Sequence, residues 1–181
     1  ANLKQILKAS HRAKDVVSQI LAFSRQTEKT DRPLKIGPIV KEGLKLLRAS
    51  IPTTIEVRQN IGEESGAVMI DASQVHQVIM NLCTNAAQAM QESGGVLEVK
   101  LDELDVCRKD GVLAKGLSPG SYVRVTVDDT GHGIPPDQKD RIFDPYFTTK
   151  EKGVGTGLGL SVVHGIVKSH DGNVFVYSRP G

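Results

Sequence analysis

The chain has 181 residues, of which 39% are hydrophobic and 24% are charged, as is usual for a soluble globular protein. This length allows one well-buried core, or one domain with an appendage. Its 23 basic and 21 acidic residues are spread through the sequence and leave a net charge of +2, which argues against a nucleic-acid-binding surface. No run of about 18 apolar residues occurs, so we expect no membrane contact from this chain.

The two cysteines, Cys83 and Cys107, form no CxxC pair, which favours reduced thiols in a cytoplasmic protein. The sequence starts at Ala1 without a signal peptide and ends in a turn-like Arg-Pro-Gly. We therefore expect both ends to be cuts from a longer protein.

Residues 2–26 contain no Gly or Pro and predict one helix with a long apolar stripe. Such a stripe needs a partner surface, either the same domain or, as we favour, a helical bundle or dimer. His11 lies in this helix, and its nearest candidate base is Asp15, four residues on. We therefore interpret His11 as a solvated surface histidine and not as a phosphoryl carrier.

From residue 33 onward, short strand-like and helix-like patterns alternate. In chain order we predict a strand over 33–37, a helix that begins at Pro38 and is closed by Pro52, strands over 54–61 and 67–70, a helix over 72–91, strands over 96–101 and 122–127, a helix over 158–170 and a last strand over 174–177. Asp71 can cap the helix over 72–91. A polar excursion over 102–120 joins two strands that we expect to be antiparallel. The order predicts an α+β fold, a mixed sheet with helices on one face.

The helix over 72–91 carries an unusual polar pair. Asn81 and Asn85 are four residues apart and so share one face, and Gln88 follows three residues later. Asparagine is a middling-to-poor helix former. The pair is therefore either a set of solvated amides or a set of oxygen ligands for a hard cation such as Mg²⁺.

Two glycine-containing stretches suggest a nucleotide site. The strand over 122–127 leads to Asp129, which is followed by Gly131 and Gly133, so a fixed carboxylate lies beside a backbone that permits close approach. The glycine run over 155–159 opens an apolar helix, whose free N–H groups and dipole favour an anion. Together they could hold a base and its phosphates.

Each motif is weak alone. The run over 155–159 is not a P-loop, because no Gly-Lys-Ser/Thr follows it, and it is not a dinucleotide fingerprint, because no strand leads directly into it. The specific signal is the ordered set of helix asparagines, strand-end aspartate, the segment Phe-Asp-Pro-Tyr-Phe-Thr-Thr-Lys over 143–150, and then glycines that open a helix.

At these residues the chain resembles the catalytic, ATP-binding domain of sensor histidine kinases of two-component systems, in the ATPase superfamily that includes gyrase B and MutL. The resemblance covers about 33–181 and implies a two-layer α/β sandwich of the Bergerat type. Residues 1–30 resemble the second helix of the dimerisation and histidine-phosphotransfer hairpin. On this resemblance, residues 31–181 form the ATP-binding domain, without its final strand.

The resemblance implies ATP and Mg²⁺ as cofactors. Asn85 would coordinate Mg²⁺ with Asn81 beside it, Asp129 would accept a hydrogen bond from the adenine amino group, and Lys150 would reach phosphate. Asn81, Asn85 and Lys150 are thus the expected catalytic residues. The other expected nucleotide-binding residues, by position in the motifs, are Gly131, Gly133, Ile134, Phe143, Phe147, Thr148, Gly155, Thr156, Gly157, Leu158, Gly159 and Leu160. Phe143 and Phe147 would position a mobile lid.

The resemblance implies a protein-histidine kinase that passes the γ-phosphoryl group to a histidine and then to a response-regulator aspartate. Many members carry a basic residue where Gln88 stands, so we expect Lys150 to substitute for it. The acceptor histidine belongs to a hairpin helix outside this sequence. The parent protein would be a homodimer in the cytoplasm, and its anchoring in the inner membrane stays open.

Two alternatives compete with the kinase. One is a nucleotide-binding module without useful catalysis. The other is an ATP-hydrolysing clamp, which needs a general base for water; clamp relatives have glutamate at the position of Asn81, and asparagine cannot accept a proton usefully. Asn81 therefore favours phosphotransfer over hydrolysis.

Overall fold

The chain divides into two compact units, Ala1–Asp31 and Arg32–Gly181. The computed structural model describes residues 31–62, 66–107, 116–150 and 155–180. The predicted hairpin helix and its His11 lie outside the described residues. The second unit holds all the motifs of the predicted nucleotide site.

The second unit alternates strands and helices much as predicted. Its elements are β1 (Arg32–Lys35), α2 (Ile36–Arg48), β2 (Ile55–Ile61), β3 (Ala67–Ile70), α3 (Ala72–Ala89), β4 (Gly95–Val106), β5 (Gly120–Asp129), the 3-10 helix η2 (Pro136–Gln138) and α4 (Gly159–Ser169).

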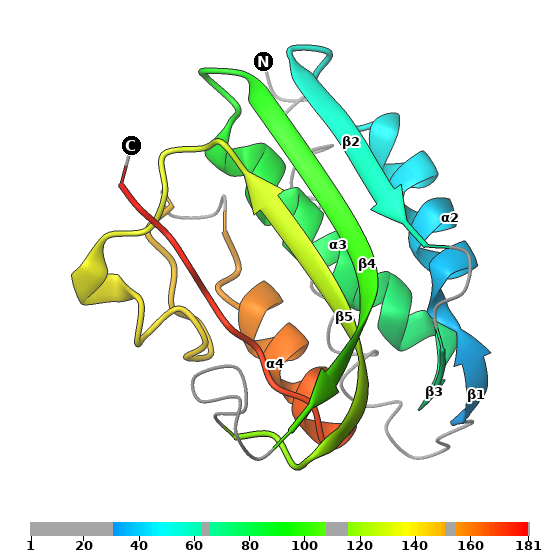
Figure 1. Ribbon diagram of the computed structural model, residues 1–181. Helices are drawn as coiled ribbons and strands as arrows, with labels where there is room; N and C mark the ends of the chain where they lie inside the picture. The colour runs from blue at the N-terminus through cyan, green and yellow to red at the C-terminus, as the bar shows by residue number, and fades with distance from the viewer. Residues whose placement is uncertain (1–30, 63–65, 108–115, 151–154, 181) are drawn as a thin grey trace. The chain divides into compact units, whose positions relative to one another are not determined.

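One three-stranded mixed sheet forms the frame of this unit. Strand β4 pairs in parallel with β2 and antiparallel with β5, and β1 and β3 form a separate antiparallel ribbon. Helices α2, α3 and α4 all lie behind the sheet in Figure 1. The predicted α+β fold, with a mixed sheet and helices on one face, is confirmed. Leu97 of β4 pairs with Asp129, so β5 ends level with the start of β4.

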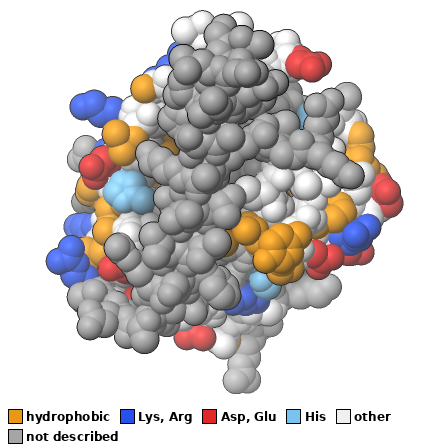
Figure 2. All heavy atoms as spheres, turned by 180° about the vertical axis from the view of Figure 1, so that it is seen from behind, with side chains coloured by type: hydrophobic (Ala, Val, Ile, Leu, Met, Phe, Trp, Pro, Cys, Tyr) orange, Lys and Arg blue, Asp and Glu red, His pale blue; other side chains and the backbone are white. Residues whose placement is uncertain are grey.

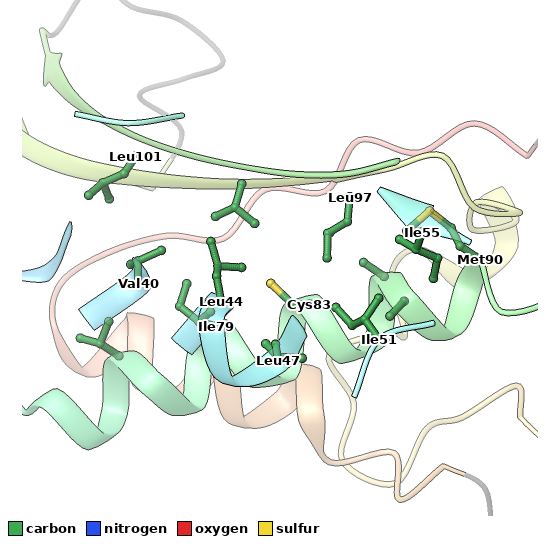
Figure 3. Close-up of a cluster of buried hydrophobic side chains, with 14 of the residues drawn as sticks. Val40, Leu44, Leu47, Ile51, Ile55, Ile79, Cys83, Met90, Leu97 and Leu101 are labelled. Carbon is green, nitrogen blue, oxygen red and sulfur yellow. The ribbon is translucent and has the colours of Figure 1, made fainter. Parts of the chain in front are cut away.

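The core fills the space between the sheet and its helices, as Figure 3 shows. Val40 and Leu44 enter it from α2, Ile79 and Cys83 from α3, and Leu97 from β4, each at most 5% exposed. Burying a side chain of this size stabilises the fold by roughly 1.5–3 kcal/mol. Burial also raises the pKa of the Cys83 thiol to about 12. The face of α3 that carries Ile79 and Cys83 therefore packs on the sheet.

The sequence of α3 explains both its start and its orientation. Asp71 is the N-cap, and its Oδ1 accepts hydrogen bonds from Ser73 N at 2.7 Å and Ser73 Oγ at 2.5 Å. These bonds hold the pKa of Asp71 below its usual value. Buried residues recur along the helix at 75, 79, 83, 86 and 87. This spacing leaves the half-buried Asn81 and Asn85 on a neighbouring face, directed away from the core.

Three predicted boundaries need correction. Residues 36–37 belong to α2 and not to the first strand, so Pro38 lies in the first turn of the helix, where its missing N–H costs nothing. The same helix ends at Arg48, well before Pro52, and the N–H groups of Ser50 and Ile51 bond to Leu47 O in the turn that follows. Strand β4 continues to Val106 and covers the first part of the predicted polar excursion.

The predicted last strand over 174–177 is wrong. The segment is extended and runs beside β5 in Figure 1, with Phe175 and Tyr177 outward at 37% and 77% exposed. Within the described residues, however, its backbone forms no hydrogen bond with β5. Alternation in the sequence selects an extended conformation, whereas a strand also needs a partner ladder.

The face of the sheet turned away from the helices is polar. Arg124 pairs with Asp102 at 2.6 Å, and Lys100 bridges Glu98 at 2.8 Å and Asp128 at 3.3 Å. On the opposite side of the molecule, the visible charges are also of both signs and lie between small groups of hydrophobic side chains (Figure 2).

None of the helices in the described ranges combines the length and the hydropathy that a membrane crossing requires.

Candidate nucleotide-binding site

Asp129 stands at the end of β5 with its carboxylate exposed. Its Oδ1 accepts a hydrogen bond from Gly131 N at 2.9 Å, which fixes the side chain against the turn that follows. The second carboxylate oxygen accepts no hydrogen bond from any described residue. Asp129 is therefore an oriented acceptor with one oxygen available to a ligand.

The turn after Asp129 is packed tightly on the last turn of α3. A Cβ placed on Gly131 would lie 2.7 Å from Ala89 Cβ and 2.9 Å from Ala89 O, closer than real side chains approach. His132 N also donates to Ala89 O at 3.4 Å. Only glycine fits at 131, and the close approach joins the aspartate end of the site to the asparagine helix.

The lid segment, residues 143–150, returns to α3 through its last residue. Lys150 Nζ donates hydrogen bonds to Asn85 Oδ1, at 3.2 Å, and to Gln88 Oε1. Lys150 is half buried, and this burial lowers the pKa of its ammonium group. Two amide oxygens, one helical turn apart, thus converge on one positive charge.

The N-terminus of α4 lies beside the same asparagines. A Cβ on Gly159 would lie 3.4 Å from Asn81 Oδ1 and 3.6 Å from Asn85 Nδ2. Helix α4 has no side-chain cap, so its first N–H groups lack a side-chain acceptor. An uncapped helix N-terminus attracts anions.

The glycine loop, residues 155–159, is fitted to the lid segment. Tyr146 N donates to Gly157 O at 2.9 Å, and both residues have positive φ, 68° and 66°. A Cβ on Gly157 would overlap the Tyr146 backbone, and one on Gly155 would lie 2.5 Å from Thr148 Oγ1. Glycine is needed at 157 because the two segments touch there through their backbones, and at 155 because a side chain would collide with the side chains of Thr148 and Lys150.

The two phenylalanines of the lid segment make different contacts. The Phe143 ring lies 5.2 Å from the His164 ring of α4, tilted by 34°. The Phe147 ring lies under the Arg141 guanidinium, at 4.6 Å. Phe143 thus ties the start of the lid segment to α4, and Phe147 packs locally.

The structure brings most of the predicted site residues into two groups. Asn81, Asn85, Lys150 and Gly159 meet at the start of α4, with Thr148 and Gly155 next to Lys150. Asp129 and Gly131 meet at the end of α3, followed by Gly133 and Ile134. Three further predicted residues, Thr156, Leu158 and the half-buried Leu160, lie along the glycine loop and the first turn of α4. Thr156 Oγ1 accepts a hydrogen bond from Leu158 N at 3.4 Å.

The prediction missed three residues that shape the site. They are Ala89, whose small side chain admits Gly131; Tyr146, which is 76% exposed and pairs with Gly157; and Ser178, which accepts a hydrogen bond from Ile134 N at 2.7 Å. Ala89 lies four residues after Asn85, so its placement on the same helix face was readable from the sequence. The other two contacts join distant segments, and no local pattern signals them.

The oxygens of Asn85 and Gln88 fit a hard cation, because they already converge on the ammonium of Lys150. In the described ranges no group of three or more His, Cys, Asp or Glu side chains could hold a metal. Side-chain amides supply oxygen atoms, which are the ligands that hard cations take.

Comparison with known proteins agrees with this geometry. Residues 70–181 match the family described as histidine kinase-, DNA gyrase B-, and HSP90-like ATPases. The chain belongs to this ATPase family.

Two of the relatives that it matches are sensor kinases. The chain is 37% identical over 180 residues to the sensor kinase CckA of Brucella abortus (strain 2308). The matched region covers 99% of this chain and 19% of CckA. It is 33% identical over 181 residues to the sensor histidine kinase ZraS of Escherichia coli (strain K12). Here the matched region covers 99% of this chain and 35% of ZraS. The chain thus spans at most about a third of these two relatives.

A solved structure gives the same assignment. The nucleotide-free catalytic domain of histidine kinase ThkA has a TM-score of 0.58 and 30% identity, covering 80% of this chain and 82% of that one. The predicted resemblance is confirmed: the second unit is a catalytic ATPase domain of the histidine kinase type.

Proposed function

We propose that this chain binds Mg-ATP and transfers the γ-phosphoryl group to a histidine on another polypeptide segment. The observation that carries the proposal is the convergence of Asn85, Gln88 and Lys150 at the open N-terminus of α4. Cation ligands, a mobile positive charge and backbone donors are the groups that stabilise a transferring phosphoryl group.

Adenine would be held at the other group of site residues. The available oxygen of Asp129 accepts a hydrogen bond from the 6-amino group. Gly131 and Gly133 shape the turn beside the base, because a side chain at either position would collide with Ala89 or with the Arg179 carbonyl. Ile134 lines the same turn. A carboxylate accepts from the amino group of adenine and repels the carbonyl oxygen that guanine carries there, so the site discriminates between these bases.

The phosphates would lie between α3 and α4. The N–H groups of residues 155–159 face them, and Leu160 follows in the first turn of the helix. Lys150 leaves the amides of Asn85 and Gln88 and donates to a phosphate oxygen, while Asn85, beside Asn81, holds Mg²⁺. Bound Mg²⁺ supplies positive charge that offsets the negative charge of the phosphates. Phe143, Phe147 and Thr148 place the lid segment over them.

In the transfer step an acceptor imidazole nitrogen forms a bond to the γ-phosphorus, and the bond from that phosphorus to the β–γ bridging oxygen breaks. The products are a phosphohistidine and ADP, which keeps the bond's electron pair. Asn81 cannot act as a base toward water, which disfavours hydrolysis. The histidine kinase ShkA has been solved with AMPPNP, and ThkA with the response regulator protein TrrA. We infer that a response-regulator aspartate receives the phosphoryl group next, in a cytoplasmic homodimeric parent protein.

The decisive experiment supplies the acceptor separately. The chain is mixed with Mg²⁺, γ-labelled ATP and a helical hairpin that carries a candidate acceptor histidine. We expect acid-labile label on the hairpin, and none when its histidine is replaced by glutamine. Asp129→Asn serves as the negative control and Asp128→Asn as the matched positive control, because Asp128 faces Lys100 on the sheet.

Two other outcomes would assign a different function. Release of inorganic phosphate without labelled hairpin would indicate a hydrolytic clamp. Tight ATP binding without either product would indicate a binding module that signals by closing its lid segment.

A further inference from the structure

The segment over 178–180 crosses the turn that we assign to the base. Ser178 Oγ accepts a hydrogen bond from Ile134 N at 2.7 Å, across 44 residues of sequence. Lys139 Nζ donates to Ser178 O at 2.6 Å. Ser178 therefore contacts the turn at Ile134 through its side chain, and the end of η2 at Lys139 through its backbone carbonyl.

Arg179, the next residue of the segment, packs against the same turn at Gly133. A Cβ on Gly133 would overlap the Arg179 carbonyl oxygen, and Gly133 has φ of 69°, which side chains rarely adopt. The turn thus has α3 on one side, through Gly131 and Ala89, and residues 178–180 on the other. The backbone between Gly131 and Ile134 has little freedom to shift.

We propose that Ser178 is a positioning residue for the adenine-binding turn, acting through the Ile134 amide. This inference rests on the proposed function, because it assumes that Asp129, Gly131, Gly133 and Ile134 hold the base. Ser178 itself need not touch the nucleotide. Loss of its hydroxyl leaves a half-buried N–H without its acceptor and lets the turn move relative to Asp129.

The first measurement is affinity. Ser178→Ala should weaken ADP binding by roughly fivefold to tenfold, the range expected for one lost hydrogen bond. Ser178→Thr keeps the hydroxyl and should restore most of the affinity. Ser169→Ala is the matched control, since the Ser169 hydroxyl donates to Ile166 O at the end of α4 and lies away from the base turn.

The second measurement separates positioning from general loosening of the fold. The Mg²⁺ concentration that gives half-maximal nucleotide binding should stay within about twofold of the unsubstituted chain, because a neutral hydroxyl at the base turn adds no charge near Asn85. Lys139→Met should weaken ADP binding in the same direction as Ser178→Ala, since it removes the second contact to the same residue.

The third measurement needs no ligand. Amide hydrogen exchange at Ile134 should accelerate in Ser178→Ala, whereas exchange at Val99 in the buried strand β4 should not.

Three results would overturn the inference. They are unchanged ADP affinity in Ser178→Ala, an equal loss in Ser178→Thr, or a Mg²⁺ midpoint that shifts together with the ADP affinity. Failure of the unsubstituted chain to bind ADP would instead refute the proposed function, and the inference with it. The exchange rate at Ile134 still reports whether the contact exists, so the two failures are distinguishable.

Discussion

The ammonium nitrogen of Lys150 lies 3.2 Å from the side-chain oxygen of Asn85, the residue proposed to hold Mg²⁺. The lysine occupies the side of the amide that a metal ion would need. Binding of Mg-ATP therefore requires Lys150 to exchange its amide partners for a phosphate oxygen. The exchange replaces a neutral acceptor with a charged one, which strengthens the hydrogen bond.

Replacement of Lys150 by Met should weaken ATP binding by about tenfold or more, because one charge-assisted hydrogen bond contributes roughly 1.5–3 kcal/mol. ADP should lose less affinity, since it lacks the γ-phosphate. Calorimetric titration with both nucleotides measures the difference. Lys168→Met is the control, because Lys168 lies exposed in the last turn of α4. Equal losses for ATP and ADP would count against a γ-phosphate contact.

Asn85→Ala should make nucleotide binding insensitive to Mg²⁺, because the chain's proposed metal ligand is gone. ADP affinity is measured by titration with Mg²⁺ and with EDTA, and the ratio of the two affinities should fall toward one. Asn60→Ala, at an exposed position of β2, should keep the ratio of the unsubstituted chain. A ratio that survives in Asn85→Ala would remove Asn85 from the metal site.

Asp129→Asn should reduce adenine-nucleotide affinity by at least about a hundredfold, or roughly 2.7 kcal/mol. The amide can present an N–H group where the base requires an acceptor, and a mismatched polar pair that the bound base shields from water is costly. Fluorescence competition with ADP measures the loss. Asp128→Asn alters a neighbouring carboxylate on the sheet face and should bind ADP normally. Undiminished affinity in Asp129→Asn would contradict the base assignment.

Asp71→Ala should lower the free energy of unfolding by about 1 kcal/mol at neutral pH, the usual effect of losing an N-cap. The cap hydrogen bonds lower the pKa of Asp71 in the folded state. Its stabilisation is therefore fully present above the ordinary pKa of an aspartate and is lost as the pH falls through the lowered folded-state value. Urea unfolding from neutral pH to pH 3 should show the two chains converging.

Asn at position 71 keeps an acceptor oxygen and should retain most of the stability of the cap. If Asp71→Asn proves as unstable as Asp71→Ala, the hydrogen bond to Ser73 is not the source of the effect.

Thiol reagents should distinguish the two cysteines. Cys83 is fully buried, and burial raises its pKa to about 12, so it is a neutral thiol at pH 8. Cys107 is exposed. At pH 8 we expect iodoacetamide to modify Cys107 well before Cys83, and both to react alike in urea; peptide mapping by mass spectrometry reads the sites. Rapid labelling of Cys83 in the folded chain would mean that α3 opens locally.

Much of the fold follows from local patterns in the sequence. Apolar spacing locates α3 and α4, alternation locates β2, β4 and β5, and Asp71 marks the start of α3. The four-residue spacing of Asn81 and Asn85 places them on one face in any helix. The class of site was readable for the same reason, since its motifs are short and each lies on one element. The alternating pattern over 174–177 led to a wrong strand prediction, because strand pairing depends on a neighbouring strand that lies elsewhere in the sequence.

Only the tertiary structure decided which of these motifs meet. Lys150 reaches Asn85 across 65 residues of sequence, and Ser178 reaches Ile134 across 44. The close fit of Gly131 on Ala89 depends on how α3 lies against the end of β5. Hydrogen bonds and steric contacts of this kind act over a few ångströms, so they form only when the helices have packed on the sheet. The sequence by itself determined the chemical groups of a nucleotide site, and the packing of α3, α4 and residues 178–180 decided their geometry.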